Sequence, residues 1–257
     1  MAVGKTPTPS DFFSRHAKDY AVSASHATGS DLDRLIELVD PQPTNIALDV
    51  ATGTGFTAAA LAQTAGCVVA VDITPEMLVE ARKLLETNEN GNLHYALANA
   101  ADLPFRDAQF DIATSRRAPH HFGDIGEFLR EVARVLKGGG RLGIVDMSPP
   151  EGARDVVNRI ERLRDPTHAR ALSPHEWEHE VTRAGFEIQV TEVIAEAVTF
   201  EEWLYPVHMG GEEEIAVRQV LNESTAEGRA SLNLRFEDEQ VAGWEKTRVA
   251  LLARNPK

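Results

Sequence analysis

The sequence predicts an α/β fold in which a parallel β-sheet carries helices on both faces. Between residues 45 and 147, short apolar runs alternate with helix-favouring segments, which is the pattern of strands joined by right-handed helical crossovers. The first apolar run leads into a turn that contains Gly53 and Gly55, and the second ends in a carboxylate, Asp72. These observations predict a ligand site where the first two strands end.

The individual elements follow from the spacing of the apolar residues. Residues 31–39 place apolar side chains on one helical face, and Pro41 and Pro43 end that helix. Beyond it, strands are predicted from short apolar runs and helices from apolar residues that recur every three or four positions. In chain order we expect a strand at 45–51, a helix at 55–65, a strand at 67–72, a helix at 75–87, strands at 93–97 and 109–115, a helix at 124–136 and a strand at 141–147.

The C-terminal half is predicted to complete the sheet. A helix at 152–164 is followed by another that begins after Ser173, a helix-capping residue, and ends near Gly185. Residues 186–198 alternate as a sixth strand, and residues 244–252 form a seventh, antiparallel strand.

The chain is expected to hold one domain with two additions. Residues 1–40 form an N-terminal helical cap, and residues 41–257 form the sheet domain. Residues 200–235 are an insertion between strands six and seven. We expect this insertion to be either a lid over the substrate or a pair of surface helices.

The turn after the first strand has the chemistry of an adenosine-type cofactor site. Gly53 and Gly55 lack a Cβ, so the backbone can approach a ligand closely, and the following helix offers unpaired N–H groups. Asp72 can accept hydrogen bonds from a ribose diol. Asp49 would repel a diphosphate but suits a cationic amine. Because the run from Gly53 to Ala58 also fits the nicotinamide dinucleotide pattern, that cofactor class stays open, as does a tight turn without a ligand.

Five segments carry a family resemblance. They are Asp49-x-Ala51-x-Gly53-x-Gly55, Asp72-Ile73-Thr-Pro-Glu-Met77, Asn99-Ala100 with Asp102-Leu-Pro-Phe105, Gln109-Phe-Asp-Ile-Ala113, and the run from Arg134 through Gly138 to Val145. In this order they resemble class I S-adenosylmethionine-dependent methyltransferases, in the branch that includes the ubiquinone- and menaquinone-biosynthesis C-methyltransferases.

Three residues depart from the family pattern. Ala51 stands where a glycine is usual, and we expect it to fit because its φ stays negative. Asn99 stands where Asp is frequent, and its side-chain oxygen can still accept from the adenine amino group. Gly138 stands where Pro is usual, so we expect a looser turn there.

The resemblance implies a Rossmann-like, doubly wound sheet of seven strands, the last antiparallel, with S-adenosyl-L-methionine as the cofactor. Its methionine portion would lie over the glycine turn, and Asp72 would bind its ribose. Tyr20 and His26, in the cap, would close over it. The implied cofactor-binding residues are Tyr20, Asp49, Ala51, Gly53, Gly55, Asp72, Ile73, Met77, Asn99, Ala100 and Arg116.

The loop after the fourth strand would border the reacting methyl group. A methyltransferase mainly aligns its reactants, and it needs a base only where the acceptor keeps its proton. His120 and His121 are the candidate catalytic residues, as a base or an orienting donor; the alternative is that they hold the loop. Arg116 or Arg117 could bind a carboxylate of the cofactor or of an acidic substrate. The alternative is a salt bridge to Asp111, Asp124 or Asp146.

Composition limits the partners. A net charge of −14 over 257 residues disfavours nucleic acid and anionic membranes, so a small molecule, either quinone-like or a specialised metabolite, is the expected acceptor. No apolar run approaches the ~20 residues that span a bilayer. No signal-peptide pattern is evident, and we expect a cytoplasmic protein that can form a homodimer. Cys67 is the only cysteine, and the nine histidines show no convincing metal-ligand spacing.

Two other functions remain open on the sequence. One is an NAD(P)-dependent oxidoreductase, since the glycine pattern fits both cofactor classes. The other is a protein that binds the cofactor without methyl transfer, which the departures at Ala51, Asn99 and Gly138 favour slightly.

Overall fold

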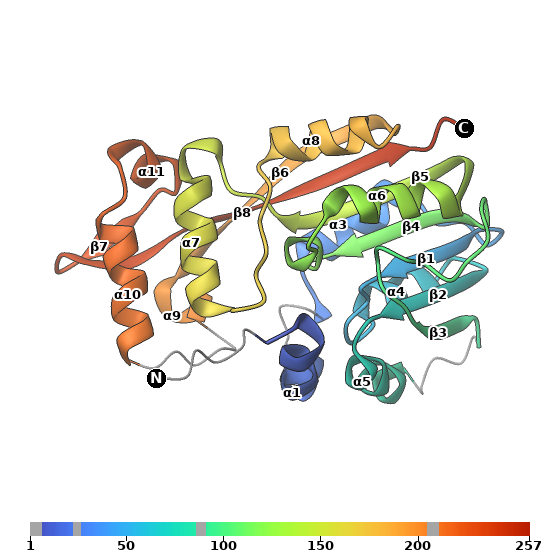
Figure 1. Cartoon of the computed structure of the whole chain (residues 1–257), viewed down its shortest axis with the longest axis horizontal. Helices are drawn as coiled ribbons and strands as arrows, with labels where there is room; N and C mark the ends of the chain where they lie inside the picture. Colours follow the sequence, from blue (N-terminus) through green and yellow to red (C-terminus); the bar gives the residue numbers. More distant parts are fainter. Residues whose placement is uncertain (1–6, 23–26, 86–90, 205–210) are drawn as a thin grey trace.

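The computed structural model describes residues 7–22, 27–85, 91–204 and 211–257 and confirms the expected α/β fold (Figure 1). The strands lie in the order β3-β2-β1-β4-β5-β8-β6. All neighbours up to β5 are parallel, and β8 is antiparallel to both β5 and β6. The strands are β1 Ile46–Val50, β2 Cys67–Asp72, β3 Leu93–Leu97, β4 Phe110–Arg116, β5 Leu136–Met147, β6 Glu187–Thr199 and β8 Gln240–Arg254.

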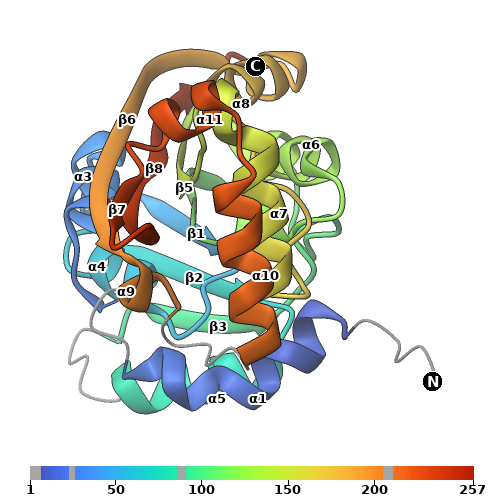
Figure 2. The same cartoon turned by 90° about the vertical axis from the view of Figure 1, so that its left-hand side faces the viewer.

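Helices cover both faces of the sheet (Figure 2). One apolar core joins the sheet to α3 and α4, and a second joins the opposite face to α6 and α8. Helix α5 packs against β2 and β3, and α1 lies against α5. These helices are α1 Pro9–Ala21, α3 Ser30–Val39, α4 Phe56–Ala62, α5 Pro75–Leu85, α6 Ile125–Val135 and α8 Pro174–Arg183.

Local sequence explains where several helices begin. Helices α1 and α8 each start with a capping box, in which the hydroxyl of Thr8 or Ser173 accepts from the backbone three residues on. A proline follows each cap in the first turn, so the start expected after Ser173 is confirmed. Helix α6 starts after Asp124, whose carboxylate accepts from the backbone N of Glu127 at 3.0 Å.

The insertion forms a separate apolar cluster with α7 (Arg154–Arg164). It lies between β6 and β8, as expected, and Figure 1 shows it where β8 extends beyond the parallel strands. Residues 205–210 of the insertion, and residues 86 and 87 of the helix expected at 75–87, lie outside the described residues. The helices of the insertion are α9 Phe200–Leu204, α10 Gly211–Asn222 and α11 Ala226–Ser231.

Two parts of the sheet differ from the expectation. A short extra strand, β7 (Arg235–Glu237), pairs with the start of β8, which begins at residue 240 rather than 244. Strand β5 begins at residue 136 rather than 141. The looser turn expected at Gly138 is wrong, because Gly139 N donates to Asn255 O at 2.8 Å and a Cβ at Gly138 would overlap the carbonyl of Lys257.

The described part of the chain contains no helix with the length and apolar character that a bilayer crossing requires.

Helix α3 packs directly on β5 at Gly143, where a side chain has no room. A Cβ at this position would overlap Val39 and come within 2.7 Å of Leu35 Cδ1. We expect Gly143→Ala to lower the free energy of unfolding by roughly 1–3 kcal/mol, because it overpacks the core. The shift of the urea midpoint measures this loss. Gly211→Ala, whose new Cβ would meet no atom within 4 Å, is the matched control, and an equal loss in both variants would contradict the explanation.

Candidate active site

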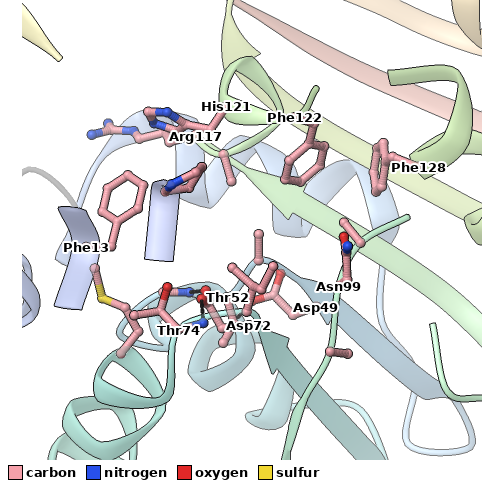
Figure 3. A pocket seen from close by; sticks show the side chains of 18 of the residues that line it. Phe13, Asp49, Thr52, Asp72, Thr74, Asn99, Arg117, His121, Phe122 and Phe128 are labelled. Atoms are coloured by element: carbon pink, nitrogen blue, oxygen red, sulfur yellow. Dashed lines mark hydrogen bonds between the residues drawn. The ribbon is translucent and has the colours of Figure 1, made fainter. Parts of the chain in front are cut away.

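A cavity of about 430 Å³ opens where the parallel strands end. Figure 3 shows Asp49 and Asp72 on one side of this space, with Arg117 and His121 opposite them. Phe13, from α1, closes a third side. The turns after β1 and β2, the loop after β4 and the N-terminal helix therefore meet at one place.

Most of the residues expected to bind the cofactor lie in the wall of this cavity. The exception is Gly55, which is the N-cap of α4 with a φ of 85°. His26 lies outside the described residues, and no described residue of the insertion lines the cavity, so the lid stays a prediction. The expected site residues in the wall are Tyr20, Asp49, Ala51, Gly53, Asp72, Ile73, Met77, Asn99, Ala100, Arg116 and His121.

Asp49 is a buried carboxylate, only 1% exposed. The hydroxyl of Thr52 donates to one of its oxygens at 2.6 Å, and that of Thr114 donates to the other at 2.7 Å. Burial raises the pKa of Asp49 to about 6, although these two hydrogen bonds oppose the rise. A bound cation would favour the ionised form, so Asp49 is suited to an ammonium group.

Asp72 connects the two turns that form the floor of the cavity. Its carboxylate accepts from Gly53 N at 2.8 Å and from Thr74 N at 2.9 Å. Burial raises the pKa of Asp72, and the backbone hydrogen bonds partly oppose this effect. Because each carboxylate oxygen has two lone pairs, Asp72 can hold the loop and still accept from a ribose diol.

Ala51 does not keep the negative φ that we expected. Its φ is 56°, and Gly53 and Gly55 are also left-handed, with φ of 55° and 85°. The turn is fastened to β2, because Thr52 N donates to Val71 O at 2.9 Å. The fold therefore requires a left-handed residue at this position, where glycine would be unstrained and alanine is not.

We expect Ala51→Gly to raise the free energy of unfolding by up to about 1 kcal/mol. Glycine removes the strain of the left-handed conformation from the folded state. The free energy gained in this way exceeds the free-energy cost of the extra conformational entropy that glycine gives the unfolded chain. Ala59→Gly, within α4, is the matched control and should have the opposite sign, because glycine destabilises a helix. Thermal melting of the two variants measures both effects, and destabilisation by Ala51→Gly would contradict the strain.

Arg116 and Arg117 share one buried carboxylate, Asp31. Arg117 donates to both oxygens of Asp31, at 2.7 and 2.9 Å, and Arg116 Nη1 lies 3.2 Å from one of them. Burial alone would raise the pKa of Asp31, but the two arginines lower it to about 2. Both arginines therefore form the salt bridge that was the alternative on the sequence, but the partner is Asp31 and not Asp111, Asp124 or Asp146. Arg116 also donates from Nε to Thr57 at 3.0 Å, which places it beside the start of α4.

The two histidines differ in their environment. His120 does not line the cavity; its Nδ1 lies 2.6 Å from Asp146, and its carbonyl accepts from Ala169 N and Arg170 N. His121 does line the cavity. Burial and the neighbouring His120 lower the pKa of His121 well below its usual value, so its imidazole is neutral at pH 7.

The hydrogen bonds of Thr167 define the tautomer of His121. The hydroxyl of Thr167 donates to Asp165 at 2.6 Å, so it must accept from His121 Nδ1, which lies 3.1 Å away. The proton therefore sits on Nδ1, and Nε2 carries the free lone pair. Nε2 lies 3.9 Å from a carboxylate oxygen of Asp165.

Sequence reasoning placed Tyr20 of the cap in the site but missed Phe13, which lies on the same helix, α1. Phe13 lines the cavity, and its ring lies edge-on to His121 at 5.0 Å and to Tyr20 at 5.6 Å. Burial raises the pKa of Tyr20 to about 12, so its hydroxyl stays neutral. The capping box at residues 8–11 was the signal that would have predicted this helix.

In the described ranges, no three His, Cys, Asp or Glu side chains lie together as a metal-binding group.

Comparison with known proteins agrees with this geometry. A family model described as a methyltransferase domain matches residues 48–144. Protein BH2331 of Bacillus halodurans C-125, assigned as a methyltransferase, is 32% identical, and its structure superposes with a TM-score of 0.84 over 89% of this chain and 100% of its own. The uncharacterized methyltransferase YcgJ of Bacillus subtilis (strain 168) is 38% identical over 168 residues, which are 65% of this chain and 66% of YcgJ.

Further similarities extend the same group. The superposition with the structure of YcgJ covers 88% of this chain and 98% of the YcgJ chain, with a TM-score of 0.84. The demethylmenaquinone methyltransferase of Corynebacterium kroppenstedtii is 37% identical over 112 residues, 44% of this chain and 46% of that protein. The chain thus spans two thirds or less of the length of these curated relatives.

The sheet order and the cavity at its carboxyl edge define a cofactor-binding α/β protein of the doubly wound class. The chain belongs to the class I S-adenosylmethionine-dependent methyltransferases. The cofactor of this family is S-adenosyl-L-methionine, as the sequence predicted, and not a nicotinamide dinucleotide.

Proposed function

We propose that this protein transfers the methyl group of S-adenosylmethionine to a small-molecule acceptor bound in the cavity. The observation that carries the proposal is the position of two buried carboxylates, Asp49 and Asp72, side by side at the cavity floor. This arrangement suits an amino-acid tail attached to a nucleoside and opposes a diphosphate.

The residues present fit the cofactor along its length. Asp49 would bind the ammonium group, and Arg116, which donates to Thr57 at the start of α4, would bind the carboxylate. Asp72 would hold the ribose. Asn99 accepts from Ala101 N at 3.0 Å through its side-chain oxygen, and the second lone pair of that oxygen can accept from the adenine amino group.

Apolar cofactor contacts and the acceptor side complete the cavity. Ile73 and Met77 offer apolar surface to the adenine ring. Bound S-adenosylmethionine supplies an activated methyl carbon, and the aromatic side chains of Phe13 and Phe122 would exclude water around it. Of the two histidines, His121 is better placed to orient an acceptor or take its proton, because it lines the cavity and its Nε2 carries no proton.

Two measurements test the proposed function. The first is calorimetric titration with S-adenosylhomocysteine and, separately, with NADH. The second is transfer of labelled methyl groups to a panel of quinols, phenols, amines and carboxylic acids. We expect binding of S-adenosylhomocysteine only, and transfer to at least one acceptor class. Binding of NADH alone would favour the oxidoreductase, and cofactor binding without any transfer would favour a protein that only binds the cofactor.

A homodimer and a cytoplasmic location remain predictions from the sequence. Light scattering on the purified protein measures the mass in solution and tests the first of them.

A further inference from the structure

We propose that the acceptor carries an anionic oxygen group, a carboxylate or a phosphate, and that Arg117 binds this group. The proposal rests on the proposed function, because it assigns the part of the cavity opposite the cofactor carboxylates to the acceptor. It identifies Arg117 as a residue that determines substrate class.

Arg117 is held at the cavity by both its backbone and its side chain. It directly follows β4, has a left-handed φ of 54°, and donates from its backbone N to Val145 O at 2.7 Å. A non-glycine residue in this conformation is strained. The surrounding structure therefore fixes the point from which the side chain starts, and Figure 3 shows Arg117 across the cavity from Asp49 and Asp72.

The guanidinium of Arg117 keeps hydrogen-bond donors that the protein does not fill. It has five N–H groups, and Nε and Nη2 each donate one to Asp31. Among the described residues, no acceptor takes the other three. The side chain is only 15% exposed and lines the cavity, so a ligand or water must satisfy these donors.

Asp31 does not neutralise Arg117 fully, because the same carboxylate also pairs with Arg116. Two guanidiniums thus share one carboxylate. Arg116, beside Thr57 and the start of α4, lies on the cofactor side, whereas Arg117 belongs to the side that bears His121. A planar guanidinium fork matches a carboxylate or a phosphate better than any neutral group.

The cavity wall near Arg117 and His121 carries aromatic side chains, and its other charged residues are Arg116 and the carboxylates Asp49, Asp72, Asp124 and Glu127. The low pKa of His121 and the high pKa of Tyr20 leave both side chains neutral near pH 7. Phe13 packs edge-on against both of them. The site therefore suits an acceptor that joins an anionic group to a planar, apolar body. Arg117 would bind the anionic group, and the aromatic side chains would contact the apolar body.

The experiment compares three small probes on protein saturated with S-adenosylhomocysteine. Benzoate and phenyl phosphate carry the two forms of the anionic group, and benzamide is the neutral control. We expect at least one anion to bind about tenfold more tightly than benzamide in an NMR titration. Arg117→Gln should weaken that anion by about tenfold or more, as loss of a charge-assisted hydrogen bond does, and should leave benzamide and S-adenosylhomocysteine unchanged. Arg106→Gln, at an exposed position, is the matched control and should change nothing.

Three results would overturn the proposal. The first is equal affinity for the anions and benzamide, and the second is no binding of either anion. The third is that Arg117→Gln lowers the affinity for S-adenosylhomocysteine and leaves the affinity for the anions unchanged. If Arg117→Gln does not fold, Arg117→Met decides, because it removes both the charge and the donors; unchanged anion affinity in that variant would also refute the proposal. Failure of the underlying function is seen separately, as absence of S-adenosylhomocysteine binding to the unaltered protein.

Discussion

Asp72→Ala should weaken the binding of S-adenosylhomocysteine by roughly tenfold to a hundredfold, the value of a charge-assisted hydrogen-bond pair. The structure gives two reasons for a large effect. The carboxylate would lose its contact with the ribose diol, and Gly53 N and Thr74 N would lose the acceptor that now holds both turns. Isothermal calorimetry at pH 7.5 measures the change in affinity.

A second substitution separates these two contributions. Asp72→Asn keeps one acceptor oxygen, so we expect it to lose less affinity than Asp72→Ala. Asp33→Ala removes an exposed carboxylate of α3 and should leave the affinity unchanged. If Asp72→Ala bound S-adenosylhomocysteine as tightly as the unaltered protein, the ribose assignment would have to be abandoned.

Asp49→Asn should weaken cofactor binding at pH 7.5 by about tenfold or more, because the cofactor's ammonium group would lose its counter-charge. In the unaltered protein, the affinity should also depend on pH. The pKa of Asp49 is about 6 in the free protein, and binding of an ammonium requires the ionised form. The affinity should therefore be constant above pH 7 and fall by up to tenfold per pH unit below 6, a dependence that Asp49→Asn should abolish.

The same substitution should have the opposite effect on stability. The pKa of Asp49 in the folded, cofactor-free protein lies above its ordinary value of 3.8. Its contribution to stability is therefore present at low pH and lost as the pH rises through about 6. At pH 7.5, Asp49→Asn should raise the melting temperature of the cofactor-free protein. Thr114 can accommodate the amide, since its hydroxyl also lies 3.5 Å from Leu48 O. A lower melting temperature together with unchanged affinity would show that Asp49 is a structural residue.

Much of the fold could be predicted because it depends on local pattern. The alternation of apolar runs over residues 45–147 predicted a parallel sheet with helices on both faces, and Ser173 predicted a helix start that capping chemistry explains. Asp49 and Asp72 could be placed in one site because they end neighbouring parallel strands, and such ends meet at one edge of the sheet.

The remaining features depend on contacts between distant segments. Asp31 pairs with Arg117 across 86 positions in the chain, and nothing local to either residue indicates the other. The backbone of Lys257 packs against Gly138. The family pattern at this turn could not indicate a contact with the distant C-terminal segment. The turn imposes the positive φ of Ala51. Alanine disfavours this conformation, so the residue type did not indicate that the backbone is left-handed there.

The structure of the complex with S-adenosylhomocysteine tests the central claim most directly. It should place the cofactor amine facing Asp49, at a hydrogen-bond distance of roughly 2.7–3.2 Å from the carboxylate or from the turn that follows it, with the ribose hydroxyls on Asp72. A complex in which the amine points away from Asp49, or in which this turn holds a diphosphate instead, would contradict the assignment of the methyl-donor site.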